Sequence, residues 1–239
     1  MDKKKAEYII RIIYPRRCPI CHEPVSAPEA FVHPECLKSV PVLTEPRCKK
    51  CGKGVESRER EYCADCTTQR HWFTRGVAVY EYGGRIKQSV QKFKFQNKRE
   101  YADFYVGQMC KSLKPFLPVW QPEALIPVPL HKTREKKRGF NQAQLLAEGI
   151  GEIFQIPVLP DLVVRVVATR PQRKLNKKKR KNNLKNAFKI PAYDVKLKRV
   201  LVIDDIYTTG STIDAISEQL TEKGVEQVYF ATLCIGKTW

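Results

Sequence analysis

The chain has 239 residues, of which 42% are hydrophobic, a length and composition that support one soluble α/β core with a smaller appended module. Its formal net charge is +19, yet residues 1–73 carry 14 Lys and Arg against 10 Asp and Glu, so most of the excess lies in the remainder. This distribution excludes an acidic or neutral surface for the residues after 73 and indicates that they bind a polyanionic partner.

The first apolar segment, residues 8–14, is much too short to span a bilayer, and Arg11 interrupts it. We expect it to form an amphipathic helix packed on its own domain. With no membrane span and no targeting segment evident, the sequence predicts a cytoplasmic protein, where disulfides are rare. The nine cysteines therefore call for metal rather than oxidation.

Eight potential ligands repeat with a period of 30 residues, each copy being a pair spaced by two residues, an interval of eleven residues, and another such pair. Four thiolates, or three with an imidazole, satisfy tetrahedral zinc with no open position, so the repeat predicts two structural zinc sites. His22 competes with His33 but has no cysteine counterpart in the second copy. The spacing leaves open whether each zinc takes one copy or the copies interleave. The predicted ligands are Cys18, Cys21, His33, Cys36, Cys48, Cys51, Cys63 and Cys66.

We place this zinc module, with the N-terminal helix, in residues 1–70, and a second domain in residues 71–239. Strands alternate with helices in the second domain, which predicts an α/β fold with a mostly parallel sheet and right-handed crossovers. Cys110 and Cys234 are interpreted as small core residues. We expect strands at 76–82, 124–130, 199–204 and 227–235, helices at 84–95, 100–114, 140–154 and 211–223, and short strand-like pieces at 157–167.

Two basic segments are candidates for binding the polyanionic partner, such as a nucleic acid. Residues 170–189 hold ten Lys and Arg and no acid, and the helix at 84–95 adds four cations with Phe93 and Phe95 between them. One of the two phenylalanines is expected in the core. A solvated basic face is the alternative. The candidate cations are Arg170, Arg173, Lys174, Lys177, Lys178, Lys179, Arg180, Lys181, Lys185, Arg85, Lys87, Lys92 and Lys94.

The most informative segment is residues 200–212, a buried apolar strand that ends in Asp204 and Asp205 and continues into a loop of small hydroxyl residues. Backbone N–H groups of such a loop, with a helix starting near Ser211, suit a phosphate, while the acids suit vicinal hydroxyls. The segment resembles the phosphoribosyl pyrophosphate signature of type I phosphoribosyltransferases. That resemblance implies binding, with Mg²⁺, by Asp204, Asp205, Thr208, Thr209, Gly210, Ser211 and Thr212.

Together with residues 124–130, 136–142 and the cysteines, this signature makes nearly the whole chain similar to the ComF family of competence-associated phosphoribosyltransferase-like proteins. By analogy, the loop of Pro127, Val128 and Pro129 occupies the pyrophosphate position and Arg138 faces that anion. A solvated cation at a helix start is the alternative for Arg138. The basic stretch falls where this fold carries its flexible loop, and Asn176, Lys178 and Lys179 make the loop more basic than is typical.

Three functions are compatible with these features. The ComF resemblance implies handling of single-stranded DNA in natural transformation, with a phosphoribosyl pyrophosphate pocket. The second possible function is that of an active phosphoribosyltransferase using Mg²⁺, although no segment indicates a binding site for an acceptor base. The third is a zinc-dependent adaptor for a competence helicase.

Overall fold

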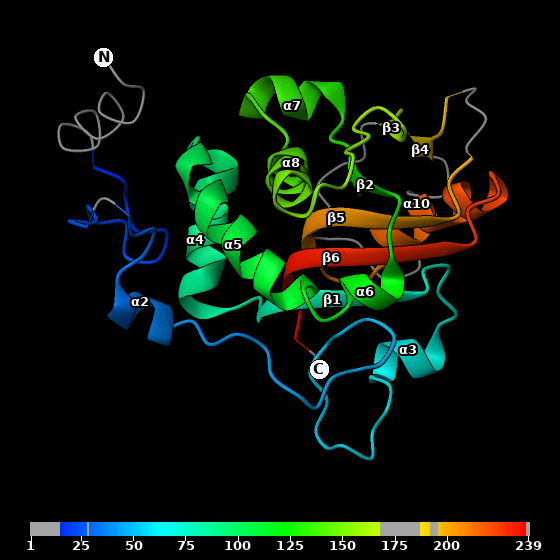
Figure 1. The fold of residues 1–239 in the computed structure, drawn as a ribbon, viewed down its shortest axis with the longest axis horizontal. Helices are drawn as coiled ribbons and strands as arrows, with labels where there is room; N and C mark the ends of the chain where they lie inside the picture. Colours follow the sequence, from blue (N-terminus) through cyan, green and yellow to red (C-terminus); the bar gives the residue numbers. More distant parts are fainter. Residues whose placement is uncertain (1–14, 28, 168–186, 192–195, 238–239) are drawn as a thin grey trace.

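The computed structural model describes residues 15–27, 29–167, 187–191 and 196–237 (Figure 1). A parallel sheet lies at its centre, helices cover both faces, and the cysteine-rich segment runs along one edge. The elements are α2 (Pro34–Lys38), α3 (Ala64–Thr68), β1 (Arg75–Glu81), α4 (Gly84–Phe95), the 3₁₀-helix η1 (Arg99–Tyr101), α5 (Ala102–Leu113), α6 (Leu117–Trp120), β2 (Ala124–Pro127), α7 (Lys132–Arg138), α8 (Gln142–Phe154), β3 (Val164–Arg165), β4 (Phe188–Lys189), β5 (Arg199–Tyr207), α10 (Ser211–Glu222) and β6 (Gln227–Ile235).

The four-stranded sheet has the order β1-β6-β5-β2, and every pair in it is parallel. Successive side chains of a strand leave opposite faces, and β5 shows both faces buried. Leu201 and Ile203 pack in the hydrophobic cluster that includes α4, α5 and α8. Val200 and Val202 pack in the cluster that includes α10. The unbroken apolar run predicted from the sequence is thus a central strand covered on both sides.

Several predicted boundaries were wrong. We expected Arg138 at the start of the helix that continues to Phe154, but α7 is a separate helix, which Gly139 ends in the left-handed region at φ 81°. The next helix then begins after Asn141, whose side chain accepts a hydrogen bond from the Ala143 N–H. Arg138 therefore lies at a helix C-terminus, where the dipole favours a cation.

The strand expected at 199–204 continues to Tyr207 because β6 still pairs with it, Tyr207 lying opposite Ile235. On the other side, β2 is shorter than the expected 124–130 and ends at Pro127, opposite Ile203. From Asp204 onward β5 therefore has no partner strand on the β2 side. This opening is where open α/β sheets bind ligands, at the carboxyl ends of their strands.

The 30-residue repeat of the sequence is also a structural repeat. In both copies the residue directly after the second cysteine is left-handed, His22 at φ 72° and Gly52 at φ 77°. A bridge spans each turn, Arg17 with Pro24 and Arg47 with Gly54. The short helices α2 and α3 then occupy equivalent positions.

The second copy covers the free edge of β1. The Leu43 N–H donates to the Val79 carbonyl and the Gly76 N–H donates to the Lys50 carbonyl, both at 2.8 Å. The approach is so close that a Cβ on Gly52 would lie 2.7 Å from the Gly76 oxygen. An exposed sheet edge invites pairing with other chains, so the cysteine-rich segment protects the fold as well as extending it.

The first copy docks instead beside α5. The imidazole Nδ1 of His22 lies 2.9 Å from the Tyr101 hydroxyl, and Arg16 forms a 3.1 Å ion pair with Asp103. In the described part of the chain, no helix has the length and apolar character that crossing a bilayer requires.

Candidate functional sites

The first cysteine cluster brings together Cys18, Cys21, His33 and Cys36, whose ligand atoms lie within 4.8 Å of one another. His33 supplies the imidazole of this cluster, the residue that the repeat predicted, with Nδ1 3.3 Å from the Cys21 sulfur. The Nε2 atom of His33 lies 3.0 Å from the Pro24 carbonyl, which can only accept, so Nδ1 keeps its lone pair for a metal. His22 is not part of this cluster.

The electrostatics of the first cluster favour a thiolate. Burial by itself would raise the pKa of Cys18, but backbone N–H groups of Cys21, His33 and Ile20 bring it down to about 7. The thiolate is the form that binds metal.

The second cluster contains only cysteines, all four from one copy, so the two sites are sequential and not interleaved. The sulfurs of Cys51 and Cys63 are 3.6 Å apart, close to the separation of about 3.8 Å expected for two thiolates bound to one tetrahedral zinc at about 2.3 Å. Beside it, the buried Lys53 donates to Asp65 at 2.9 Å. Both donor sets thus fit a structural zinc. The ligands of the second cluster are Cys48, Cys51, Cys63 and Cys66.

The acid pair of β5 lies at the opening beyond β2, and a cation from another element pairs with it. Lys94 reaches it from α4 and forms an ion pair with Asp205 at 2.7 Å, with both side chains largely buried. The Asp205 N–H donates to the Asp204 carboxylate at 2.8 Å. A cation predicted to bind DNA therefore lies inside the candidate pocket.

Asp204 has the most perturbed carboxyl group of this site. Burial raises its pKa to about 8 and the neighbouring Asp205 carboxylate adds to the rise, while the Lys94 ammonium opposes it. Lys94 forms its ion pair with Asp205, so the Asp204 carboxylate bears the cost of burial beside a second negative charge. Ligand hydroxyls or a bound cation would stabilise the ionised Asp204.

Three arginines complete the surroundings of the acid pair. Arg138 donates to the Gln142 side chain and stacks on Phe95, its guanidinium 5.0 Å from the ring centroid. Desolvation lowers the pKa of Arg138, and the charges of Asp205 and Asp204 oppose that change. Desolvation likewise lowers the pKa of Arg165 to about 10, with Arg134 acting in the same direction and Asp204 in the opposite one. These cations make the open carboxyl end of β5 attractive to a polyphosphate.

The loop after β5 leads directly into α10, which begins at Ser211 as predicted. Gly210 has φ 77°, and a Cβ there would lie 2.4 Å from the Tyr207 hydroxyl, so only glycine fits this turn. Thr208 is exposed, and the hydroxyls of Thr209 and Ser211 are 2.8 Å apart. Together with Thr212, these residues place N–H and hydroxyl groups at the start of a twelve-residue helix, where an anion is favoured.

The Pro127 to Pro129 loop is held next to the acid pair. The Val128 N–H donates to the Ile203 carbonyl at 2.9 Å, and the Asn141 side chain donates to the Val128 carbonyl at 3.1 Å. All three loop residues are buried. The structure thus brings this loop, the acid pair and Arg138 to one edge of the sheet.

Of the predicted DNA contacts, Arg85 and Lys87 are exposed on α4 and Lys92 is half-buried. Phe93 lies in the core while Phe95 is 67% exposed, which confirms that one of the two is a core residue. Cys110 and Cys234 are buried as expected. The other predicted cations lie outside the described residues: Arg170, Arg173, Lys174, Lys177, Lys178, Lys179, Arg180, Lys181 and Lys185.

Sequence reasoning missed Arg134 and Arg165 altogether and misplaced Lys94. No local signal separates Lys94 from Lys87 or Lys92 on the same basic helix. A local signal does mark Arg165, because it is the single cation in the apolar run from Leu162 to Val167. A lone charge inside an apolar run indicates a paired or functional position more often than a packed one.

Comparison with known proteins assigns these features to families. A family model described as a double zinc ribbon domain matches residues 9–67, and one described as a phosphoribosyl transferase domain matches residues 150–238. A double zinc ribbon joined to a phosphoribosyltransferase-like α/β domain is therefore the class of protein that the fold and the sites define.

Full-length relatives narrow the class. The chain is 35% identical over 193 residues to Competence protein F of Haemophilus influenzae, covering 77% of this chain and 82% of that protein. It is 28% identical over 207 residues to Competence protein ComFC of Bacillus subtilis (82% and 80% covered) and 26% identical over 223 residues to DNA utilization protein YhgH of Escherichia coli K12 (92% and 97% covered). The chain belongs to the ComF/ComFC family of competence proteins.

Among solved structures, a purine phosphoribosyltransferase from Pyrococcus horikoshii aligns with 20% identity and a TM-score of 0.37, over 55% of this chain and 73% of that one. The fold assignment rests instead on the family model and on the parallel sheet.

Proposed function

We propose that this protein handles single-stranded DNA during natural transformation and that the crevice at the end of β5 binds phosphoribosyl pyrophosphate with Mg²⁺. The names of the relatives, competence protein and DNA utilization protein, support the process. The acid pair, the loop that leads into α10 and the nearby arginines support phosphoribosyl pyrophosphate as the ligand.

In this proposal, Asp204 and Asp205 accept hydrogen bonds from the ribose hydroxyls, and the 208–212 loop holds the 5′-phosphate. The Pro127 to Pro129 loop and Arg138 take the pyrophosphate. Mg²⁺, which prefers carboxylate and phosphate oxygens, would neutralise part of the pyrophosphate charge near the acid pair. Lys94 stabilises the acids until the ligand arrives, and its ammonium is then available to a phosphate oxygen.

One observation carries the link between the crevice and DNA. The Val166 N–H donates to the Ala187 carbonyl at 2.9 Å, so the two ends of the intervening segment meet beside β3 and β4. The neighbouring Arg165 shares an electrostatic interaction with Asp204. The basic stretch therefore starts and ends next to the crevice, where a bound strand and a bound phosphoribosyl group would influence each other.

Calorimetric titration with phosphoribosyl pyrophosphate and Mg²⁺, with and without an oligothymidylate, tests this proposal. We expect both ligands to bind and no pyrophosphate to be released. Absence of phosphoribosyl pyrophosphate binding, or of DNA binding, in the zinc-loaded protein would contradict it.

An active phosphoribosyltransferase is the second candidate, favoured by the match of residues 150–238 to the phosphoribosyl transferase domain. Release of pyrophosphate in the presence of one particular nucleobase would establish that activity.

A further inference from the structure

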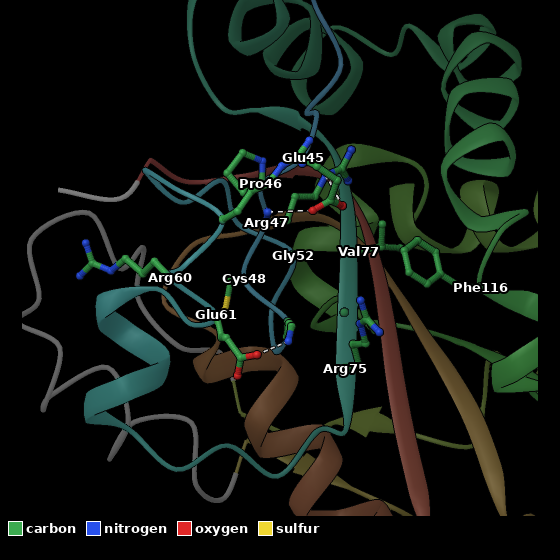
Figure 2. A pocket seen from close by; sticks show the side chains of 13 residues that line it. Glu45, Pro46, Arg47, Cys48, Gly52, Arg60, Glu61, Arg75, Val77 and Phe116 are labelled. Atoms are coloured by element: carbon green, nitrogen blue, oxygen red, sulfur yellow. Dashed lines mark hydrogen bonds and ion pairs between the residues drawn. The ribbon is translucent and has the colours of Figure 1, made fainter.

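A separate cavity of about 400 Å³ lies between the second zinc ribbon and the beginning of β1 (Figure 2). The turn with Cys48 and Gly52 forms one wall, and Arg75 and Phe116 project from the other side. Since β6 separates β1 from β5, this cavity is distinct from the crevice at the acid pair. It exists only because the ribbon docks on the sheet edge.

The cavity is positively charged. Its two acids are already committed, Glu61 to an ion pair with Lys49 and Glu45 to one with Arg47 at 3.8 Å. Within the described residues, Arg58 and Arg75 have no ion-pair partner. The lining holds five cations against these two acids, namely Arg47, Lys49, Arg58, Arg60 and Arg75.

Arg75 is held in place by a column of aromatic rings. Its guanidinium lies over Phe116, 5.3 Å from the ring centroid. Phe116 stacks on Trp120 at 5.0 Å and 28°, and Trp120 stacks on Tyr229 at 4.6 Å and 6°. Tyr229 belongs to the central sheet, so the column anchors the guanidinium to the rigid core. An arginine oriented before binding loses less side-chain freedom on contact with an anion.

We infer that this cavity binds a nucleotide through its phosphate, with Arg75 and Arg58 as the anion contacts. Guanidinium groups match phosphate geometry and stay charged at any physiological pH. The volume falls in the range of small-molecule sites and exceeds what a phosphate group alone needs, and Pro46, Val77 and Phe116 offer apolar surface to a sugar or base. The nucleotide belongs either to a single strand or to a free nucleoside monophosphate.

This inference goes beyond the proposed crevice function and does not depend on it. Zinc-loaded wild-type protein, Arg58→Gln/Arg75→Gln and the matched charge control Lys38→Gln/Lys223→Gln are titrated with labelled oligothymidylate and, separately, with thymidine 5′-monophosphate. We expect the first variant to bind the preferred ligand about tenfold more weakly, because two charge-assisted contacts are lost, and the control to match wild type. Arg58 is fully on the surface, so Arg58→Gln alone preserves the fold and should show a smaller loss in the same direction.

Photocrosslinking of a 5-bromodeoxyuridine oligonucleotide, followed by peptide mapping, locates the contact. Crosslinks to residues 45–61 or to Phe116 that disappear in Arg58→Gln/Arg75→Gln support the inference for a strand. Monophosphate binding that shows the same sensitivity, without crosslinks, supports it for a free nucleotide. Unchanged affinities for both ligands, or binding of an acidic phosphopeptide only, would overturn it. Phosphoribosyl pyrophosphate binding should be equal in all variants, so failure here is distinguishable from failure of the crevice proposal.

Discussion

Three ionisable groups set the charge of the crevice at the end of β5. Lys94 offsets one carboxylate, Asp205, through a 2.7 Å contact, and Asp204 is left with a raised pKa. Arg138 and Arg165 also interact electrostatically with the acid pair, yet ionisation of Asp204 still costs free energy because of its burial and the adjacent Asp205 carboxylate. A ligand that brings hydroxyl donors and Mg²⁺ would stabilise the ionised Asp204, so an acid pair that is unfavourable for folding can be favourable for binding.

The raised pKa of Asp204 predicts a pH dependence of stability. The carboxyl has an ordinary pKa of about 3.9 when unfolded and about 8 when folded, so the folded state holds its proton more tightly. This contribution is complete below the unfolded pKa and is lost as the pH rises through the folded pKa. The ligand-free wild type should therefore lose stability between about pH 4 and pH 8.

Urea unfolding at pH 5 and pH 8 measures this effect. At pH 8 we expect Asp204→Asn to be more stable than wild type by about 1–3 kcal/mol, and at pH 5 the difference should be much smaller. Parallel stability profiles for the two proteins would show that Asp204 is not the group that titrates.

At the scale of the element, the turn between β5 and α10 is fixed by the packing of one side chain. Tyr207 stacks on Phe230 at 4.9 Å, and its buried hydroxyl lies against Gly210 with no hydrogen-bond partner among the described residues. The conformation of the 208–212 loop thus depends on both the left-handed Gly210 and the Tyr207 ring.

Replacing Gly210 with Ala should destabilise the protein by about 1–3 kcal/mol and weaken phosphoribosyl pyrophosphate binding, because the new methyl group is strained by φ and meets the Tyr207 hydroxyl. Adding Tyr207→Phe removes the closest contact, that with the hydroxyl, but leaves the ring carbon Cζ at 2.8 Å and the backbone strain, so Gly210→Ala/Tyr207→Phe should recover part of the loss. Thermal unfolding and calorimetry on wild type and the two variants measure this. No recovery would place the effect in the backbone and the ring carbons.

The basic stretch makes a prediction of its own. If Lys177, Lys178, Lys179, Arg180 and Lys181 contact phosphates, replacing all five with Gln should make the dependence of log affinity on log salt shallower by about three units, from roughly −0.7 per contact on single strands. Every single-stranded sequence should weaken alike, since lysines do not read bases. An unchanged slope in fluorescence anisotropy titrations would make this run a solvated face.

The elements show where sequence reasoning ends. The helix at 84–95, the buried run before Asp204 and the clustering of each set of predicted metal ligands follow from local periodicity and spacing, and the structure confirms these three features. The extension of β5 to Tyr207 depends on pairing with β6, and the Lys94 contact with Asp205 joins elements more than one hundred residues apart. Such long-range partners leave no mark in a single sequence.

At the scale of the molecule, the two zinc ribbons contact different elements of the α/β domain. The first docks beside α5 through His22, away from the phosphate loop. The second lies along β1, and the residues that follow it reach α10, where His71 contacts Asp214 at 2.6 Å. Phe73 then packs edge-on against Tyr207. The second ribbon therefore supports the element that begins at the phosphate loop.

We accordingly expect two zinc ions per chain and unequal effects when each site is broken. His33→Ala should reduce the zinc content to about one and leave phosphoribosyl pyrophosphate binding intact, because a closed structural site stabilises its surroundings locally. Cys51→Ser should reduce the zinc content equally and also weaken that binding. Elemental analysis and calorimetry on both variants test this, and a fully zinc-loaded His33→Ala protein would contradict the ligand assignment.

In the proposed function, the acids of β5 hold the ribose of phosphoribosyl pyrophosphate. Calorimetric titration of this ligand with Mg²⁺ into wild type and Asp204→Asn/Asp205→Asn tests this role directly. The control is Glu152→Gln/Asp161→Asn, which removes two exposed acids elsewhere. The acid-pair variant should lose most of the affinity, since charge-assisted hydrogen bonds are worth roughly 1.5–3 kcal/mol each, while the control should bind as wild type does. Undiminished binding by Asp204→Asn/Asp205→Asn would contradict the account.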